Sequence, residues 1–394
     1  MSGSAITPAT YVQTATERVL IGEAAADAIA SEATRLNASR VFLLVSRSLN
    51  RNTDEIAKIT KALGARFAGL HDGMPAHGPR SAVLAAAAAA REARADLIVS
   101  VGGGSVTDAA KVMSVCLKHN LKTHEDMEPF HMFVNDAGGV TNPTFDGPDV
   151  RVICVPTTLS GGEFNTLSGA TDERAKLKQG YEHRMMAPVA IVLDPAVTRH
   201  TPEWLWLSTG VRALDHAIET LGSFQSNYFC DSMAESALKL LGEGLARVKA
   251  DPADMDARLK CQVGAWQSMI PVIAGVPMGL SHATGHALGG TFDVPHGHTS
   301  CVMAPFALAF NASVNGERQK RISVALGAGG EAASVVTDRL ITSLGMPRSL
   351  GAVGVKKSDL PRLADAIMQD IWTRTNPRAV ATAAEVTAFL ETAL

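Results

Sequence analysis

Four histidines lie at spacings that could build an active site in the C-terminal half of this sequence. His282 and His286 are four residues apart, so on a helix their side chains would share one face. His296 follows in a second segment that contains glycine, and His216 lies upstream of both. Imidazole changes charge near neutral pH and binds metal ions when it is neutral. A single histidine on a helix is more often a hydrogen-bonded core residue, but four in such segments predict an active site.

An arginine accompanies the histidines where a metal site would need a carboxylate. Arg212 precedes His216 by four residues, on the same face of the expected helix. Its guanidinium stays protonated and repels a divalent cation. Asp215 would point about 100° away from His216 around that helix, which makes it a poor substitute ligand. We therefore expect no tightly held divalent ion such as Fe or Zn. An ordinary salt bridge from Arg212 to Asp215 or Glu219 is the simpler alternative role for this arginine.

A run of glycines predicts a second site, one that binds a diphosphate. Residues 102–104 are all glycine, and they follow an apolar stretch and precede Ser105, where a helix would begin. Glycine lets the backbone approach a diphosphate closely, and a helix N-terminus offers free N–H groups to the anion. The pattern is neither G-x-G-x-x-G nor a P-loop, and a tight turn without a ligand would look the same. Thr157 and Thr158 end a further apolar stretch, at the sheet edge where open sheets bind ligands, which favours the nucleotide interpretation.

Alternating strands and helices in the N-terminal half must position the glycine turn. Short apolar runs bounded by polar residues are typical of buried parallel strands. Such runs occupy residues 41–45, 67–70, 97–101, 152–155 and 190–193. Helical patterns at 54–63 and 80–94 lie between them and predict a parallel sheet covered on both faces. Residues 120–149, rich in proline and glycine, predict a long surface loop.

Beyond residue 196 the strand signals stop and the sequence becomes helical. The expected helices cover residues 203–222, 231–248, 255–272, 317–344, 358–368 and 383–394. The fold class is therefore α/β, with a Rossmann-like parallel-sheet domain followed by an all-helical domain. We place the nucleotide-binding domain at residues 1–196 and the catalytic, substrate-binding domain at residues 197–394.

Composition excludes several classes of protein. The chain has 394 residues, of which 46% are hydrophobic and 19% charged, as expected for a globular protein of two domains. Its formal net charge is −3 and it has no long basic run, so we expect no binding to nucleic acid or membrane. The alanine run at residues 85–90 is too short to span a bilayer. Five cysteines without a C-x-x-C spacing favour a reducing compartment, and we predict a cytoplasmic protein.

Together these motifs resemble the iron-containing alcohol dehydrogenase superfamily, and within it most closely the maleylacetate reductases. The resemblance extends over most of residues 20–390. The residues that carry it are Gly102, Gly103, Gly104 and Ser105 with Asp108 and Lys111, Pro156-Thr157-Thr158 through Gly162 and Glu163, Leu193-Asp194-Pro195, His216 to Glu219, Gly279 to His286, Gly289-Gly290 and Pro295-His296. The segments similar to the reductase branch in particular are His77-Gly78-Pro79 and Asn376-Pro377-Arg378.

The resemblance implies a dehydroquinate synthase-like fold and a nicotinamide cofactor at the glycine turn. Lys178 matches a lysine that reaches the ribose or nicotinamide region of the cofactor. The residues expected to bind the cofactor are Ser46, Gly102, Gly103, Gly104, Ser105, Asp108, Thr157, Thr158 and Lys178. The resemblance also implies a homodimer.

The resemblance also assigns the histidines. In metal-dependent relatives one aspartate and three histidines hold the ion. Three of these positions match His216, His282 and His296, while the aspartate position holds Arg212. His286 matches a histidine that lies beside the nicotinamide. The reductase branch also lacks the aspartate and works without metal, but it has asparagine there, so Arg212 departs from both patterns.

The expected reaction is hydride transfer between NADH or NADPH and a small carbonyl or alcohol, best represented by a maleylacetate-type oxo-acid from aromatic degradation. Arg212 would stabilise the developing oxyanion or clamp a substrate carboxylate, and His216, His282 or His286 would deliver the proton. Three alternatives stay open. They are a metal-dependent alcohol or aldehyde dehydrogenase, a lyase like dehydroquinate synthase, and a binding protein that kept the fold. The lyase is disfavoured because the helical half lacks lysine-rich phosphate-binding stretches.

The end of the first expected strand bears on the choice of cofactor. Ser46 and Arg47 stand where NAD-selecting proteins often place an acid on the ribose hydroxyls. Without that acid, and with an arginine adjacent, the site permits NADPH. We therefore predict that both cofactors are used.

Overall fold

The computed structural model describes residues 10–135 and 139–394, which form two compact units. The N-terminal unit is Gln13–Thr201, and the C-terminal unit is Pro202–Leu394 together with residues 10–12. The domain boundary predicted near residue 196 lies in the short helix α7 (Pro195–Thr198), shortly before this division.

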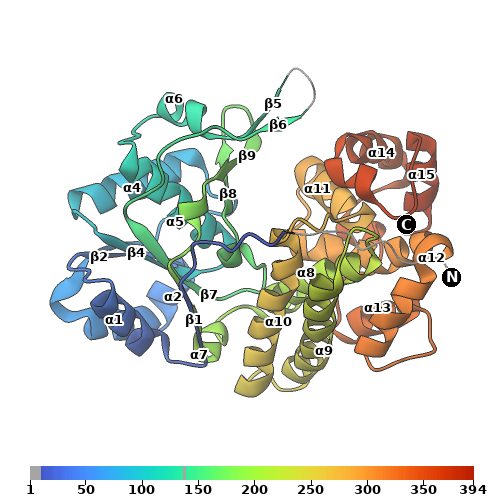
Figure 1. Cartoon of the computed structure of the whole chain (residues 1–394), viewed down its shortest axis with the longest axis horizontal. Helices are drawn as coiled ribbons and strands as arrows, with labels where there is room; N and C mark the ends of the chain where they lie inside the picture. Colours follow the sequence, from blue (N-terminus) through green and yellow to red (C-terminus); the bar gives the residue numbers. More distant parts are fainter. Residues whose placement is uncertain (1–9, 136–138) are drawn as a thin grey trace. The chain divides into compact units, whose positions relative to one another are not determined.

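A six-stranded parallel sheet forms the centre of the N-terminal unit, in the order β1-β10-β7-β4-β2-β3 (Figure 1). Its strands are β1 (Arg18–Ile21), β2 (Val41–Val45), β3 (Phe67–His71), β4 (Leu97–Gly102), β7 (Arg151–Pro156) and β10 (Ala190–Leu193). The five predicted strands and the α/β fold class are confirmed. Of the six strands of this sheet only β1 was missed, because its apolar run has just three residues and both ends of this edge strand are exposed.

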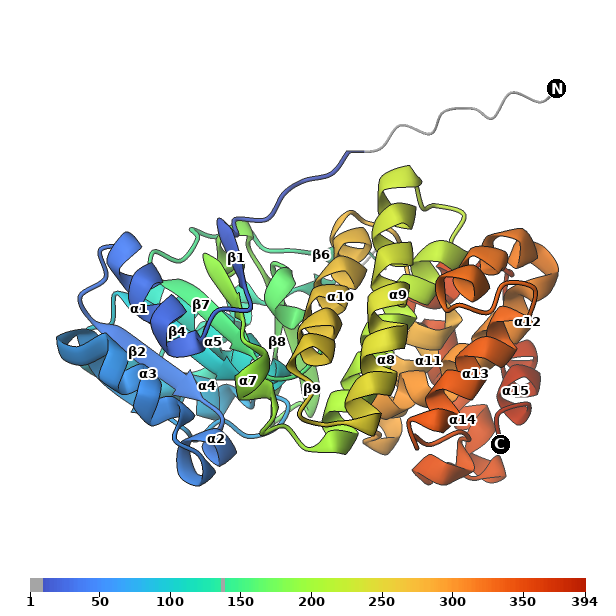
Figure 2. The same cartoon turned by 90° about the horizontal axis from the view of Figure 1, so that it is seen from below.

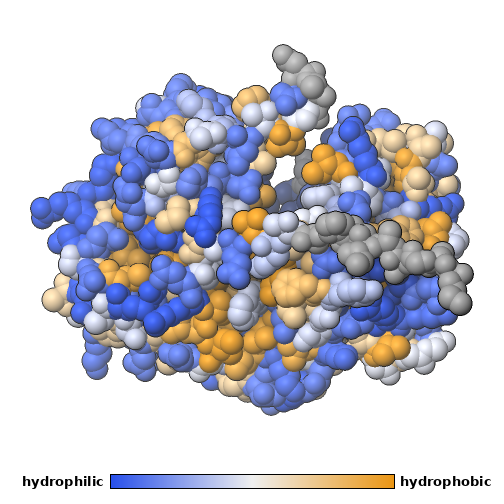
Figure 3. Space-filling view, in the orientation of Figure 1, coloured by the Kyte–Doolittle hydropathy of each residue, from blue (hydrophilic) through white to orange (hydrophobic). Residues whose placement is uncertain are grey.

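Alternate residues along the central strands point into two separate cores. Leu43 and Val99 pack with α1 and α3 on one face, and Phe42 and Ile98 with α4 and α5 on the other (Figure 2). The helices of this unit are α1 (Ala25–Arg35), α2 (Arg47–Asn52), α3 (Glu55–Leu63), α4 (Arg80–Glu92), α5 (Gly104–Lys118), α6 (His124–Met127) and α7. The surface over α1 is mostly hydrophilic, as expected for a helix that buries only one face (Figure 3).

The parallel register brings three strand ends to one edge of the sheet. Val45 pairs with Val101, and Gly102 pairs with Pro156. The carboxyl ends of β2, β4 and β7 therefore lie side by side, and α5 begins at this edge. In open α/β sheets this is the edge that binds ligands.

The long loop predicted at residues 120–149 is partly wrong. The segment contains α6 and a small hairpin of β5 (Phe133–Val134) and β6 (Val140–Thr141), although residues 136–138 lie outside the described part. Thr123 starts α6 through a capping box with Asp126, a local signal that outweighs the surrounding prolines. A second hairpin of β8 (Leu167–Asp172) and β9 (Leu177–Glu182) had no prediction, because its strands are mixed in polarity and lack a continuous apolar run.

Helices make up the regular structure of the C-terminal unit over the described residues 202–394. They are α8 (Glu203–Gly222), α9 (Tyr228–Ala250), α10 (Met255–Ile273), α11 (Leu280–Phe292), α12 (His296–Ala325), α13 (Ala333–Ser343), α14 (Leu360–Gln369) and α15 (Ala383–Glu391). In Figure 2, α8, α9 and α10 run side by side, and α12 packs against both α8 and α11. Among the described residues, none of the helices is long and apolar enough to cross a membrane.

The single helix predicted at residues 317–344 is wrong. This stretch holds the end of α12 and the whole of α13, separated by a turn. Gly327 and Gly330 in this turn have φ angles of +78° and +102°, which a helix does not allow. The break was not predicted, because the apolar periodicity continues on both sides of the turn.

Candidate functional site

The glycine turn is tightly enclosed by its neighbours. A Cβ atom at Gly103 would lie 3.0 Å from Cγ2 of Thr158, and one at Gly104 would lie 3.1 Å from Oγ of Ser160. The turn therefore cannot hold larger residues without a shift of the adjacent segment. The first N–H groups of α5 have no acceptor within the helix, and together with the helix dipole they form a site for an anion.

The second and third strand ends complete this edge. The backbone N–H of Thr157 donates to Gly102 O at 3.0 Å, and that of Ser46 donates to Val101 O at 2.9 Å. The hydroxyl of Thr158 lies 3.2 Å from that of Ser160. The structure thus brings together the residues that the sequence predicted separately, and this donor set fits the diphosphate of a dinucleotide.

Asp108 and Lys178 meet beside the glycine turn. Asp108 lies on α5 and Lys178 on β9, and Nζ of the lysine is 3.1 Å from Oδ2 of the aspartate. The lysine side chain is half exposed. Ser105 is used differently, because its Oγ accepts a 3.1 Å hydrogen bond from the backbone N–H of His77. Ser105 therefore fixes the neighbouring loop.

A buried lysine supports the segment that follows Thr158. Lys111 is fully buried, and its Nζ donates to the carbonyl oxygens of Gly162, Asn165 and Leu167 at 2.7–2.9 Å. Burial lowers the pKa of Lys111 and raises the pKa of the nearby Glu163 to about 7. Sequence reasoning noted both residues but gave them no role, because their partners lie about 50 residues away.

In the C-terminal unit, α8 supplies four ionisable side chains that are buried or nearly so. Arg212, Asp215, His216 and Glu219 follow one another at steps of one, three or four residues, so they gather on neighbouring faces of the helix. The surrounding positions of α8 are mostly apolar and buried. Helix packing therefore fixes these polar groups in a dry environment, where electrostatic interactions are strong.

The predicted histidines come together as two ring pairs. The rings of His216 and His282 have centroids 4.9 Å apart, and those of His286 and His296 are 5.9 Å apart. Burial, reinforced by neighbouring positive charge, lowers the pKa of His216 and His282 well below the usual range. Both therefore stay neutral at physiological pH. Among the described residues, Nδ1 of His216 and Nε2 of His282 are buried without a hydrogen-bond partner.

Carboxylates hold two of these rings, although the sequence indicated Glu219 only as a partner of Arg212 and did not indicate Asp370. Nδ1 of His282 is 2.6 Å from Oε2 of Glu219, and Nδ1 of His286 is 2.8 Å from Oδ2 of Asp370. Such partners fix the ring orientation and the tautomer. This role of Glu219 could have been found, since it is an acidic residue in an apolar helix seven positions after Arg212. Asp370 gives no such signal, because it lies in a loop 84 residues from His286.

Arg212 is buried beside these groups, with 9% of its surface exposed. Its Nη1 donates to Oγ of Ser300 at 3.2 Å, and that hydroxyl lies 2.8 Å from Oδ2 of Asp215. The salt bridge weighed as an alternative is thus replaced by a link through serine. Burial lowers the pKa of Arg212, whereas the charges of Asp215 and Glu219 raise it. For both carboxyls, burial raises the pKa.

Asp215, Glu219 and His282 are possible ligands for a metal ion, and most of their carboxylate oxygens already have hydrogen-bond partners. Ligand atoms of Asp215, Glu219 and His282 lie within 4.8 Å of one another, a grouping that the sequence did not predict. However, Oδ2 of Asp215 already accepts from two serine hydroxyls, and both oxygens of Glu219 accept backbone N–H groups or His282. Arg212 lies three residues before Asp215 on the same helix, and its guanidinium repels a cation.

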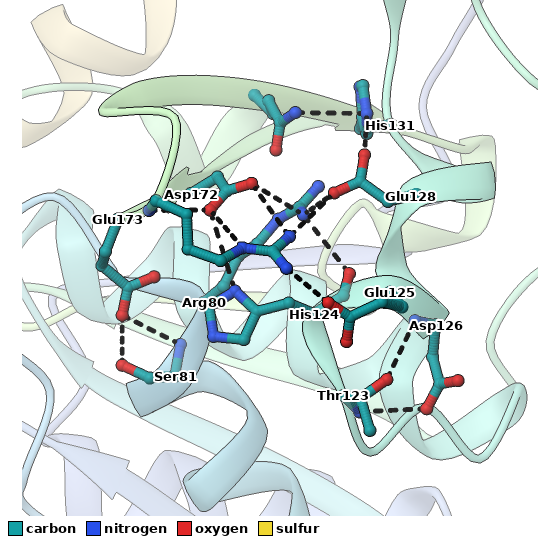
Figure 4. A network of polar contacts seen from close by, with 12 residues as sticks. Arg80, Ser81, Thr123, His124, Glu125, Asp126, Glu128, His131, Asp172 and Glu173 are labelled. Carbon is teal, nitrogen blue, oxygen red and sulfur yellow. Dashed lines mark hydrogen bonds and ion pairs between the residues drawn. The ribbon is translucent and has the colours of Figure 1, made fainter.

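A second group of possible ligands belongs to the N-terminal unit. His124, Asp172 and Glu173 also bring ligand atoms within 4.8 Å of one another (Figure 4). Asp172 is ion-paired with the fully buried Arg80 at 3.4 Å and with Arg174 at 3.2 Å. Two guanidinium groups beside the carboxylate disfavour a metal ion. The network instead fastens β8 to α4 and so supports the hairpin that carries Lys178.

Two family models match the chain and between them cover most of it. The model described as "Iron-containing alcohol dehydrogenase" matches residues 16–195, and "Fe-containing alcohol dehydrogenase family, C-terminal" matches residues 206–394. Their junction falls at the division between the two units.

Individual relatives and solved structures agree. Dehydrogenase FUM7 of Gibberella moniliformis is 31% identical over 387 residues, covering 89% of this chain and 90% of that protein. Maleylacetate reductase of Sphingobium indicum is 31% identical over 363 residues, covering 92% and 91%. The crystal structure of maleylacetate reductase from a Rhizobium species has a TM-score of 0.82 at 27% identity, covering 99% of both chains. The chain belongs to the iron-containing alcohol dehydrogenase family of oxidoreductases.

Proposed function

We propose that this protein reduces a small carbonyl compound with NADH or NADPH, that its substrate is a maleylacetate-type oxo-acid, and that it does so without a tightly bound metal. The observation that carries the proposal is Arg212, a buried guanidinium next to the neutral imidazoles of His216 and His282. The similarity to maleylacetate reductases over most of the chain supports the substrate class.

The N-terminal unit holds the cofactor in this proposal. The N–H groups at Gly104 and Ser105 and the hydroxyl of Thr158 bind the diphosphate, and Lys178 approaches the ribose. When bound, the nicotinamide supplies the hydride. The close packing of the glycine turn against Thr158 keeps these donors in place before the cofactor arrives.

The C-terminal unit handles the carbonyl. As negative charge develops on the carbonyl oxygen, a fixed cation in a water-poor site stabilises it. Arg212 is that cation. We assign proton delivery to His286, because its ring is 41% exposed and can exchange protons with solvent, whereas His216 and His282 are buried and neutral. Asp370 orients the ring of His286 from behind.

The test is a screen of NADH and NADPH oxidation with a panel of oxo-acids and aldehydes, each run with and without a chelator, alongside metal analysis. We expect turnover of an oxo-acid that chelation leaves unchanged and that His286→Ala abolishes. A stoichiometric divalent ion together with chelator-sensitive turnover would instead establish the metal-dependent dehydrogenase, which the grouping of Asp215, Glu219 and His282 favours. No turnover of any compound by the wild-type protein would indicate a binding protein.

A further inference from the structure

The guanidinium of Arg212 is anchored along one edge only. Nη1 donates to Oγ of Ser300, and Ser300 in turn lies 2.8 Å from Oδ2 of Asp215. Arginine only donates hydrogen bonds and a carboxylate only accepts them, so the serine must accept from one and donate to the other. The chain from Arg212 to Asp215 therefore has a single direction. In the described part of the protein, no hydrogen bond from Nε or Nη2 of Arg212 to another residue is present.

Asp215 accepts the hydrogen bond of this serine in a buried position. It is fully buried, and its Oδ2 accepts a second 2.8 Å hydrogen bond from Oγ of Ser281. A buried guanidinium without a counter-charge costs several kcal/mol, roughly, and an isolated buried carboxylate costs as much. Among the described residues, the hydrogen bond that Arg212 makes is to the hydroxyl of Ser300, and no ion pair within 4.0 Å joins it to a carboxylate. The two charges thus compensate each other through the hydroxyl, and in the described part of the protein Nη1 is the guanidinium nitrogen that this link uses.

Gly285 of α11 lies directly beside the guanidinium of Arg212. A methyl group at Gly285 of α11 would lie 3.3 Å from Nη1 of Arg212 and 2.8 Å from Oγ1 of Thr299. Glycine at this position therefore lets the guanidinium lie against α11. Three helices, α8, α11 and α12, converge on one side chain.

We infer that Ser300 and Asp215 are positioning residues whose role is to hold Arg212 as a built-in cation, oriented so that its free N–H groups receive the substrate oxygen. This inference rests on the proposed function, since it explains how the cation is aimed. The serine sets the orientation of the guanidinium, and the aspartate sets the direction of the serine hydroxyl.

The guanidinium ion itself is a probe for this cradle. Arg212→Ala in the full-length protein removes the side chain and leaves Ser300 and Asp215 in place. We would titrate millimolar guanidinium into R212A and into R212A/S300A, with sodium chloride of equal ionic strength as reference, and measure the melting temperature. A ligand bound to the folded state raises the melting temperature saturably, whereas guanidinium acting on unfolded protein lowers it.

We expect guanidinium to bind R212A. It should bind R212A/S300A at least about 10-fold more weakly, because the double variant lacks one charge-assisted hydrogen bond. Ser268→Ala is the matched control, because Ser268 is a buried serine that bonds only within its own helix. In R212A/S268A the affinity should equal that of R212A. Equal affinity of R212A and R212A/S300A, or no binding to R212A, overturns the inference.

A second measurement leaves the arginine in place and so does not depend on the folding of R212A. With maleylacetate as the assay substrate, Ser300→Ala should lower kcat about 10-fold and leave the KM for NADH unchanged, and Ser300→Thr should restore kcat. If Ser300 had only a structural role, Ser300→Ala would lower the stability and leave kcat unchanged. That result would contradict the inference. If wild-type protein reduces no carbonyl, the proposed function fails, while the guanidinium titration still decides whether the cradle exists.

Discussion

Nδ1 of His282 lies 2.6 Å from Oε2 of Glu219, although the two residues are 63 positions apart in the sequence. The same carboxylate accepts the backbone N–H groups of Gly279 and Ser281 at 2.9 Å. Glu219 thus caps the start of α11 and fixes the ring of the histidine two residues later. One side chain on α8 determines both where α11 begins and how its first histidine is oriented.

We predict that Glu219→Gln reduces kcat about 10- to 100-fold, the range seen when a partner that orients a functional histidine is lost. The amide offers one acceptor oxygen where three donors converge, so an N–H group of the glutamine must face another N–H group. Steady-state kinetics of carbonyl reduction measure the change. Glu235→Gln, which removes an ion pair with Arg321 at the edge of the same unit, is the control and should keep wild-type kcat. Wild-type kcat in Glu219→Gln would show that the orientation of His282 is unimportant.

Lys178→Met should weaken cofactor binding. The change removes the 3.1 Å ion pair with Asp108 and a positive charge near the expected ribose site. Hydrogen bonds to charged groups contribute about 1.5–3 kcal/mol, so the KM for NADH should rise about 10-fold or more while kcat changes little. Lys320→Met removes a surface pair with Glu317 and should leave both constants unchanged. A fall in kcat at constant KM would place Lys178 at the chemical step instead.

Ser46→Asp should turn an enzyme that uses both cofactors into one that prefers NADH. The serine ends β2 at the cofactor edge, and an acid there repels the 2′-phosphate of NADPH. We expect kcat/KM for NADPH to fall at least about 10-fold, since like charges in contact cost more than 1.4 kcal/mol, roughly. Ser46→Ala should retain both activities. Strict NADH dependence of the wild-type protein would contradict this prediction.

Glu163→Gln should change how stability depends on pH. Burial raises the pKa of the Glu163 carboxyl to about 7, whereas an unfolded chain has a pKa of about 4.3. Between these values the folded state keeps a proton that the unfolded state has released, so this group makes stability fall as pH rises through this window and stay level above it. The full contribution is about 3 to 4 kcal/mol.

Urea unfolding at pH 5 and at pH 8 measures the effect. The free energy of unfolding of the variant should exceed that of the wild-type protein by about 1 kcal/mol at pH 5 and by about 3 to 4 kcal/mol at pH 8, because the amide has no charge to bury. The exposed Glu92→Gln is the control in the same unit. Parallel pH profiles of Glu163→Gln and the wild-type protein would mean that Glu163 is solvated in solution.

Local sequence patterns were sufficient for the elements and for the positions of the functional segments. The buried strand β2 is a uniform apolar run and β4 is apolar apart from Ser100 and its final glycine, so their side chains pack in the interior of a sheet. Three glycines in a row, as at residues 102–104, let a ligand approach the backbone closely in any fold. His282 and His286 share a face of α11 because a helix repeats every 3.6 residues, as a general rule. All of these depend on neighbours within a few positions.

The contacts that give these residues their roles needed the tertiary structure. Ser300 is 85 residues from Asp215, and Lys178 is 70 residues from Asp108. The packing of α12 against α8, and of α5 against β8 of the hairpin, brings these partners together. The sequence alone determined that an arginine replaces an acid among histidines. Only the fold decided that this arginine is buried and held through a serine, because burial and pairing depend on which helix faces meet, and no local repeat contains that information.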